Sequence, residues 1–260
     1  MVGSTSPRRV GGYEGRIGRY GPELAVALMK AADVSVGQRA LDVGCGGGAL
    51  TKPLAEMLGP ENVAAVDPDP AAVGTCGARL PGVPVQVAAA EALPFADREF
   101  DVVLAQLVVS LMADPRKGAG EMRRVARRGG VVATCVWDFA GGMTLLRTFW
   151  DAAATLDPAA GSRDQAKTRP FGDRDQLDWL WRSAGLVDVA TGELIAGAGY
   201  ADFEDLWVHL VAPDGSPGAY FAELEAPHRD ALRGEVRRRL GSPTGSFRLT
   251  ARAWYVRGRA

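Results

Sequence analysis

The sequence predicts an α/β protein in which a doubly wound, mostly parallel sheet carries a helical cap. Short apolar runs alternate with helical stretches from residue 39 to residue 137. The first of these runs breaks into glycines just before a helix begins. Such alternation is typical of βαβ units, whose parallel strands join one sheet.

Length, composition and charge agree with this class. The chain has 260 residues, of which 47% are hydrophobic and 23% charged, as in ordinary globular proteins with a sizeable core. Its 30 basic and 31 acidic side chains leave a net charge of -1, which provides no field to concentrate nucleic acid or an anionic membrane. Arginine runs at 123–128 and 237–239 have helical spacing and are interpreted as solvated faces.

The core elements follow one another in a regular order. Residues 1–12, rich in Gly, Ser, Pro and Arg, predict an irregular terminus, and an amphipathic helix is expected over 22–32. The expected strands are 40–43, 62–66, 83–87, 100–106 and 130–136. The expected helices between them are 51–58, 70–79 and 114–127, the last ending in basic residues and glycine.

Beyond residue 137 helices outnumber strands. Helices are expected over 143–156, 173–184, 200–211 and 219–240, and strands over 186–193 and 246–256. The expected domains are an N-terminal arm and helix over 1–36, interpreted as a lid, a cofactor-binding core over 37–137, a helical cap over 138–245 that includes the sixth core strand, and a terminal core strand within 246–260.

Cysteine usage predicts a reduced, cytoplasmic protein. Cys45, Cys76 and Cys135 are odd in number and lack C-x-x-C spacing, so they imply neither a disulfide framework nor a zinc site. Cys45 and Cys135 are interpreted as packing residues. No apolar core follows the arginine pair at 8–9, and no run of 18 apolar residues occurs.

The strongest chemical signal is the glycine-rich turn between the first strand and its helix. Gly44, Gly46 and Gly48 allow a sharp bend and let the backbone approach a ligand closely. The helix that follows presents free N–H groups. Asp67 ends the second strand, where a carboxylate can accept hydrogen bonds from both hydroxyls of a ribose.

These features alone would also suit a dinucleotide enzyme, because the same fold and ribose carboxylate serve NAD. Asp42 distinguishes the two, since it stands two places before the first glycine, where dinucleotide fingerprints are apolar. The interpretation of Asp42 itself stays open between a cofactor contact and a carboxylate that positions the helix.

Residues 41–51 resemble the first motif of class I S-adenosylmethionine-dependent methyltransferases, and Asp67 resembles their second-strand acid. Residues 90–95 and 100–103 resemble the third and fourth motifs, and 127–132 the turn before the fifth strand. The resemblance covers roughly residues 13–137 and is closest to the small-molecule branch that includes quinone-biosynthesis enzymes, methyltransferase type 11. It implies a Rossmann-like sheet of seven strands with an antiparallel terminal strand.

The resemblance also implies S-adenosylmethionine as cofactor, released as S-adenosylhomocysteine. The implied cofactor-binding residues are Asp42, Gly44, Cys45, Gly46, Gly48, Asp67, Pro68, Ala90, Glu91, Gln106, Leu107 and Tyr20. Of these, the glycines and Gln106 would border the methionine moiety, Asp67 the ribose, and the Ala90–Glu91 pair the adenine. The chain departs from its relatives at Ala89, where they commonly carry an aspartate that would accept from the adenine amino group. A lid carrying Tyr13, Arg16 and Tyr20 is a further expectation.

The expected reaction is in-line methyl transfer to a small molecule, with proximity as the main source of catalysis. If the acceptor must lose a proton to a base, the candidate bases are His209 and His228. His209 is the better candidate because it lies on a helix of the expected cap. No Asn-Pro-Pro-aromatic sequence follows the fourth strand, which argues against methylation of amide or exocyclic amino nitrogens. Neither nucleic acid, membrane nor metal is an expected partner, and the chain is expected to be a monomer or homodimer.

Two alternatives remain. One is an NAD(P)-dependent oxidoreductase, although the chain lacks a Tyr-x-x-x-Lys pair. The other is a non-catalytic module that binds S-adenosylmethionine without turnover, for which Ala89 is the one hint.

Overall fold

The computed structural model describes residues 15–260, which divide into two compact units. The sheet unit holds residues 21–137, 170–195 and 253–260, and the helical unit holds residues 15–20, 138–169 and 196–252. The ranges predicted for arm, core and cap stay predictions.

The sheet has seven strands in the order β3-β2-β1-β4-β5-β7-β6. They are β1 (Ala40–Val43), β2 (Val63–Asp67), β3 (Val85–Val87), β4 (Phe100–Gln106), β5 (Ala126–Trp137), β6 (Val187–Tyr200) and β7 (Phe247–Arg259). The first five pair in parallel, and β7 runs antiparallel to β5. The predicted fold class, a Rossmann-like sheet with an antiparallel terminal strand, is thereby confirmed.

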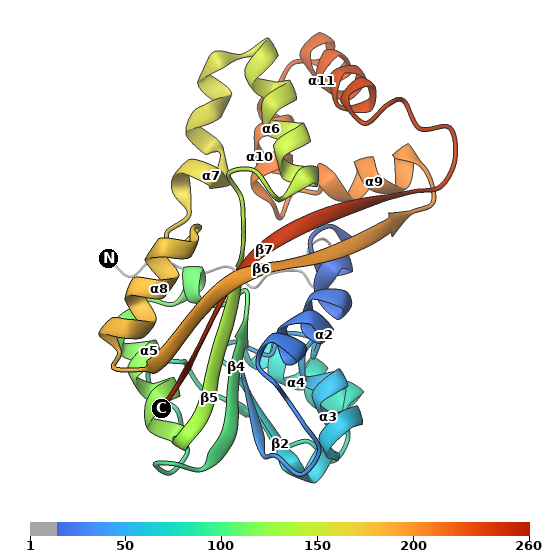
Figure 1. The fold of residues 1–260 in the computed structure, drawn as a ribbon. Helices are drawn as coiled ribbons and strands as arrows, with labels where there is room; N and C mark the ends of the chain where they lie inside the picture. Colours follow the sequence, from blue (N-terminus) through green and yellow to red (C-terminus); the bar gives the residue numbers. More distant parts are fainter. Residues whose placement is uncertain (1–14) are drawn as a thin grey trace. The chain divides into compact units, whose positions relative to one another are not determined.

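Helices cover both faces of this sheet (Figure 1). Those of the sheet unit are α2 (Gly21–Ala31), α3 (Thr51–Leu58), α4 (Pro70–Arg79), α5 (Pro115–Val125) and α8 (Arg174–Ser183). In Figure 1, α2, α3 and α4 lie on one side of the strands and α5 and α8 on the other. Both α4 and α5 begin with an aspartate that accepts a backbone N–H, followed by proline, a strong helix start.

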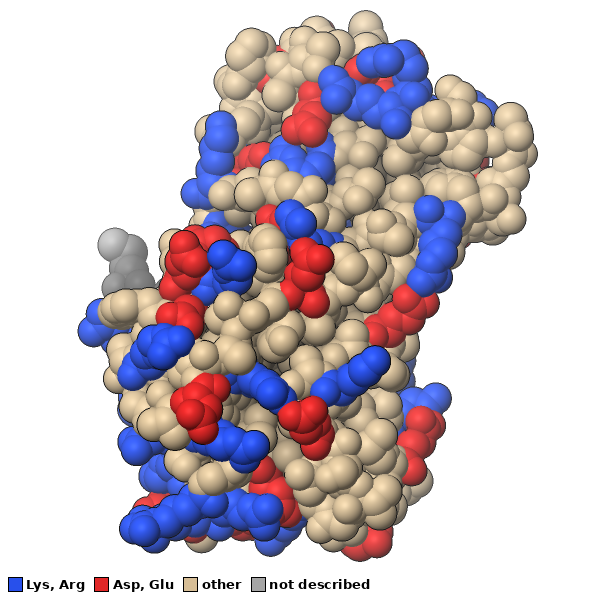
Figure 2. Space-filling view, viewed as in Figure 1, with Lys and Arg blue, Asp and Glu red and all other residues tan. Residues whose placement is uncertain are grey.

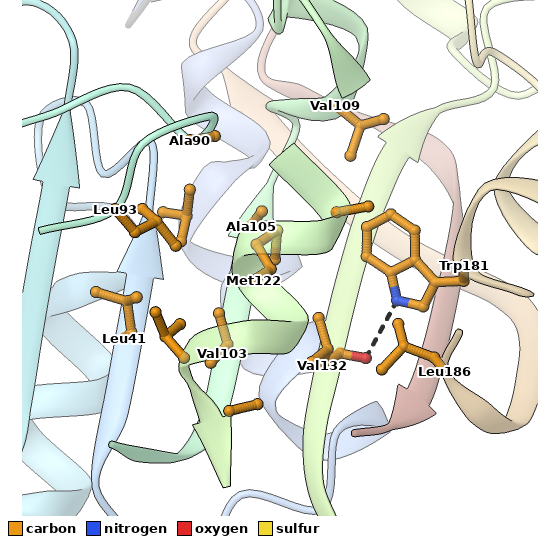
Figure 3. Packing of buried hydrophobic residues seen from close by; sticks show 14 of the residues in the cluster. Leu41, Ala90, Leu93, Val103, Ala105, Val109, Met122, Val132, Trp181 and Leu186 are labelled. Atoms are coloured by element: carbon orange, nitrogen blue, oxygen red, sulfur yellow. Dashed lines mark hydrogen bonds between the residues drawn. The ribbon is translucent and has the colours of Figure 1, made fainter. Parts of the chain in front are cut away.

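The α5–α8 face of the sheet is closed by large apolar side chains (Figure 3). Met122 of α5 and Trp181 of α8 are fully buried and pack in one cluster with Val103 of β4 and Val132 of β5. The Trp181 indole Nε1 donates to the Val132 carbonyl at 3.3 Å. This packing fixes the strands whose carboxyl ends carry the candidate site.

The helical unit contains five α-helices among its described residues, α6 (Thr144–Leu156), α7 (Gln165–Thr168), α9 (Phe203–Leu210), α10 (Ser216–Glu223) and α11 (Ala226–Arg239). Its core is aromatic: Trp150 lies edge-on to Phe149 at 5.1 Å between ring centroids and 5.7 Å from Tyr220. The Trp150 indole donates to Gln165 Oε1 at 2.6 Å, which joins α6 to α7.

Three predictions differ most from the observed bounds and are wrong. Strand β5 begins at Ala126, so α5 ends earlier than expected, and β6 continues to Tyr200, where a helix was expected to begin. The expected long helix is two helices, α10 and α11, and Leu224 and Glu225 between them are extended. Pro227 lacks an N–H and its ring would clash with the carbonyl four residues earlier, so it fits only in the first turn of a helix, and α11 starts there anew.

Within residues 15–260, no helix has both the length and the apolar character that crossing a bilayer requires. On the face drawn in Figure 2, acidic and basic side chains lie among one another. Among the described residues several charges are paired, as in the contacts of Arg124 with Glu121 and Asp97 at 2.7 and 2.8 Å.

Candidate functional site

Backbone hydrogen bonds join the turn after β1 to the end of β2. The backbone N–H groups of Gly44 and Cys45 both donate to the Val66 carbonyl, at 2.7 and 2.9 Å. Gly44, Gly46 and Gly48 have φ angles of +78°, +53° and +89°, the left-handed region that favours glycine. Since β1 pairs with β2 on one side and with β4 on the other, the turn lies where strand order reverses, the usual ligand position in such sheets.

The three glycines have different surroundings. A Cβ at Gly44 would clash with Val108 Cγ2, and one at Gly48 would lie 3.1 Å from Leu80 and 3.2 Å from the Cys76 sulfur. A Cβ at Gly46 would have no described atom within 4 Å. Gly44 and Gly48 therefore allow protein to pack against the turn, whereas Gly46 opens onto space that a ligand can fill.

Replacing Gly44 by alanine is expected to destabilise the fold by about 2 to 4 kcal/mol, because a left-handed backbone and a clash with Val108 act together. Urea denaturation measures the loss. The double variant Gly44→Ala/Val108→Ala removes the clash and should recover part of the lost stability. If it recovers none, a clash with Val108 is not the cause of the loss.

Asp67 lies beside this opening at the end of β2. It is half-buried, and its Oδ2 accepts from Gly46 N and its Oδ1 from Asp69 N, both at 2.9 Å. Each carboxylate oxygen has two acceptor sites, so each retains one for a further donor. The exposed Pro68 follows directly and turns the chain into α4.

Asp42 is buried, with 1% of its surface exposed, and only one of its two carboxylate oxygens has a hydrogen-bond partner among the described residues. Its Oδ2 accepts from Thr51 Oγ1 at 2.6 Å, so the carboxylate does position the start of α3. Its Oδ1 is buried with no hydrogen-bond partner among the described residues. Burial raises the pKa of this carboxyl to about 7, although the Thr51 bond opposes the shift.

This raised pKa makes stability depend on pH. The unfolded carboxyl ionises near its ordinary pKa of 3.8, whereas the folded one keeps its proton until about pH 7. The folded state thus binds more protons between these values, and the contribution of Asp42 to the free energy of unfolding falls by about 4 kcal/mol as pH rises through this window.

Asp42→Asn cannot titrate, so its free energy of unfolding relative to the unsubstituted protein should increase from pH 4 to pH 7 and level off above. Chemical denaturation of both proteins across this range, without ligand, measures the difference. Parallel curves would contradict a raised pKa at Asp42.

The end of β4 carries a second unsatisfied acceptor. Gln106 Nε2 donates to the Gly21 carbonyl at 3.3 Å, whereas Gln106 Oε1 is buried without a partner among the described residues. Leu107 follows with φ +64°, a costly conformation for leucine, held by its N–H on the Cys135 carbonyl at 3.0 Å. The sheet edge therefore presents two buried oxygens, from Asp42 and Gln106, that a cationic ligand would satisfy.

The residues expected near adenine lie after β3. Ala90 is buried and Glu91 half-buried, and Glu91 Oε1 accepts from Asp114 N at 3.0 Å, which holds the start of α5. Ala89 is exposed, and its carbonyl accepts from Ala92 N at 3.1 Å. Glu91 thus stabilises the start of α5, in addition to the contact with adenine that is predicted for it.

The remaining candidates belong to the helical unit. Tyr20 is fully buried, with its hydroxyl 3.5 Å from that of Tyr200, and burial raises its pKa. Arg16 is buried and donates to the His209 carbonyl at 3.2 Å, and His209 Nε2 lies 3.7 Å from Asp205 Oδ1. The roles of Tyr20 and His209 toward a cofactor or acceptor stay predictions.

Two further residues were predicted, His228 as a second candidate base and Tyr13 as part of the lid. His228 lines a cavity of about 170 Å³ in the helical unit, together with Asp157 and Tyr220. Tyr13, expected in the lid, lies outside the described residues.

Sequence reasoning missed Thr51, Cys76 and Val108, which support the turn from within the protein. Thr51 holds Asp42, Val108 packs against Gly44, and the Cys76 sulfur lies 3.7 Å from Thr51 Oγ1. For Thr51 a signal existed, since it is the first residue of the helix that follows the turn.

This geometry agrees with the comparison with known families. Residues 41–134 match the family described as "Methyltransferase domain". The chain carries a class I, S-adenosylmethionine-dependent methyltransferase domain. The matched residues include the turn, Asp67 and the Ala90–Glu91 pair, so the family resemblance expected from the sequence is confirmed.

Relatives of this methyltransferase domain occur in mycobacteria. An uncharacterised protein of Mycobacterium bovis is 35% identical over 176 residues, covering 64% of this chain and 63% of the relative. A probable phthiotriol/phenolphthiotriol dimycocerosates methyltransferase 2 of Mycobacterium ulcerans is 42% identical over 106 residues, 39% of this chain and 40% of the relative. The match thus spans less than two thirds of each relative's length.

Solved structures share the fold of the methyltransferase domain. A putative methyltransferase from an antibiotic biosynthesis pathway of Anabaena variabilis is 18% identical with a TM-score of 0.60, covering 91% of this chain and 98% of that one. At this identity the likeness establishes the fold alone.

Proposed function

We propose that this protein transfers the methyl group of S-adenosylmethionine to a small-molecule acceptor and releases S-adenosylhomocysteine. One observation carries the proposal: the turn after β1 opens at Gly46 directly beside the Asp67 carboxylate, within a matched methyltransferase domain. The hydroxyls of a ribose at this position would donate to Asp67. The methionine part of the cofactor would then pass over Gly46.

The residues present fit this cofactor. The unsatisfied oxygens of Asp42 and Gln106 suit the positively charged methionine end, since cations satisfy buried acceptors. Ala90 and Glu91 would border the adenine. The remaining predicted contacts, from Cys45, Pro68, Leu107 and Tyr20, belong to the same proposal.

Catalysis would rest on positioning. S-adenosylmethionine, when bound, supplies a methyl group that is already activated, so the protein needs mainly to hold the acceptor atom in line and exclude water. Such positioning is worth on the order of 7 to 11 kcal/mol. For an acceptor that must lose a proton, we propose His209 as the base.

Two observations favour a small-molecule acceptor, namely the mixed surface charge of the protein and the name of one relative. Basic side chains are interleaved with acidic ones on the face drawn in Figure 2, and the net charge is -1. The Mycobacterium ulcerans relative is named as a methyltransferase of phthiotriol/phenolphthiotriol dimycocerosates, not of nucleic acid. We propose that the cap over 138–245 selects the acceptor, that the arm over 1–36 serves as lid, and that the protein acts as a monomer or homodimer.

Isothermal titration calorimetry tests the proposal and both alternatives. S-adenosylhomocysteine should bind with a Kd in the micromolar range, and NAD should not bind. Transfer of radiolabelled methyl from S-adenosylmethionine to compounds in a cell extract should then be detected. Binding of NAD alone would favour an oxidoreductase, and cofactor binding without transfer to any acceptor would favour a non-catalytic module.

A further inference from the structure

The cavity of about 170 Å³ in the helical unit lies where three helices meet. Ala153 in the last turn of α6 and Asp157 directly after that helix line it. Tyr220 of α10 and two residues of α11, His228 and Leu232, complete this part of the lining. All of these residues belong to one compact unit, so the cavity is defined within it.

Most of the cavity wall is apolar, and one part of the wall is open to solvent. Ala153 and Leu232 are fully buried and Leu224 is half-buried, whereas Leu156 is 42% exposed and His228 is exposed. A ligand can therefore enter past Leu156 and His228. Because an apolar cavity of about 150 Å³ can hold benzene, a cavity of this volume fits an apolar group of roughly six carbon atoms.

The polar part of the wall is a hydrogen-bonded pair, Tyr220 and Asp157. The buried Tyr220 hydroxyl donates to Asp157 Oδ2 at 3.3 Å, and Asp157 Oδ1 accepts from Ala159 N at 2.9 Å. Each carboxylate oxygen has two acceptor sites, so each retains one for a further donor. Burial raises the pKa of Tyr220, so its hydroxyl stays protonated and its oxygen can also accept a hydrogen bond.

The charge of this pair is negative and is not neutralised by a neighbour. Within residues 15–260 no ion pair joins Asp157 to a basic side chain. Arg163 acts electrostatically on Tyr220, but its guanidinium is paired with Glu223 at 2.7 Å. A carboxylate beside apolar walls attracts a cation more strongly than one in bulk water, because the local dielectric constant is lower. The cavity therefore favours a cation with an apolar body and disfavours an anion.

We propose that this cavity binds a small primary amine, whose compact apolar body packs against the leucines and whose ammonium group donates to Asp157 and Tyr220. An ammonium group has three donors and no acceptor, which matches an unpaired carboxylate and a hydroxyl oxygen. The proposal goes beyond the proposed methyl transfer, since it assigns a second ligand to residues of the helical unit and needs no bound cofactor.

Titration of the full chain with benzylamine, followed by the NMR spectrum of the protein, tests the proposal without S-adenosylmethionine. Shifts should be concentrated at residues 153–157 and 220–232 and should saturate with a Kd on the order of 1 mM. Benzyl alcohol, which has the same shape without the charge, should bind about tenfold more weakly, and benzoate should not bind. No saturable shift at these residues, or benzoate binding as tightly as benzylamine, would overturn the proposal.

Asp157→Asn isolates the charge. It retains an oxygen that can accept from Ala159 N, so the turn after α6 should persist, while affinity for benzylamine should fall about tenfold. Asp202→Asn is the matched control, because Asp202 likewise accepts a backbone N–H, that of Asp205 at 2.9 Å, but does not line the cavity. The control should bind as tightly as the unsubstituted protein. Equal affinities of the two variants would show that the Asp157 carboxylate does not recognise the amine.

Leu224→Trp tests the apolar part of the cavity. The larger side chain should fill the space and abolish benzylamine binding, with thermal unfolding as the check that the variant is folded. Tyr220→Phe keeps the ring packed against Trp150 and removes only the hydroxyl, so it should weaken binding several-fold even if Leu224→Trp does not fold. Unchanged affinity in Tyr220→Phe and in folded Leu224→Trp would place the amine elsewhere and overturn the proposal. A failure of S-adenosylhomocysteine to bind would instead reject the proposed function and leave this result unaffected.

Discussion

Asp67→Ala is expected to weaken S-adenosylhomocysteine binding by about 100-fold or more. The carboxylate would accept two ribose hydroxyls and already holds Gly46 N and Asp69 N at 2.9 Å. Hydrogen bonds to a charged group are worth about 1.5 to 3 kcal/mol each, so loss of two corresponds to at least this factor. Isothermal titration calorimetry of the folded variant measures it.

Two variants separate the ribose contact from damage to the loop. Asp67→Asn keeps one acceptor oxygen and should lose less affinity than Asp67→Ala. Asp69→Ala removes the carboxylate that accepts from Ala71 N at the start of α4 but leaves Asp67 in place, and should bind nearly as well as the unsubstituted protein. If Asp67→Ala bound the ligand with unchanged affinity, the assignment of the site would fail.

Gly46→Ala is expected to abolish measurable cofactor binding while the protein stays folded. An added methyl group meets no described atom within 4 Å, so the stability cost is only that of a left-handed alanine, about 1 to 2 kcal/mol. The methyl would occupy the opening where we propose that the methionine part of the cofactor passes. Calorimetry and urea denaturation of the same preparation measure both effects.

Gly129→Ala is the matched control. Gly129 has φ +73°, likewise has no described atom within 4 Å of an added Cβ, and lies in β5 among the residues that precede the buried part of that strand. It should lose similar stability and keep full affinity for S-adenosylhomocysteine. Equal affinity losses in the two variants would indicate backbone strain, not occlusion of a ligand.

Several elements could be located from the sequence to the residue. Strands β1 and β4 and helices α3 and α4 have the bounds that were predicted. In each case a local signal was strong: an apolar run, a glycine turn, or an aspartate followed by proline. Such signals act within a few residues and need no distant partner.

The second half of the chain was harder to predict because its elements depend on distant partners. Strand β6 runs on through Ala196, Gly197, Ala198 and Gly199, which have little intrinsic preference for a strand. Its place beside β7 in the sheet supplies the hydrogen bonds that the local sequence does not specify. The same reason explains why a helix was expected to begin at Tyr200.

By itself, the sequence determined the glycine turn, the acid at the end of β2 and the family to which the domain belongs, because these depend on residue type and short spacing. Only the tertiary structure decided which side of the turn is open, and that one oxygen of Asp42 and one of Gln106 have no hydrogen-bond partner among the described residues. Those facts arise where the ends of β1, β2 and β4 converge with α3 and α4, and residues far apart in the chain become neighbours there only after the sheet has formed.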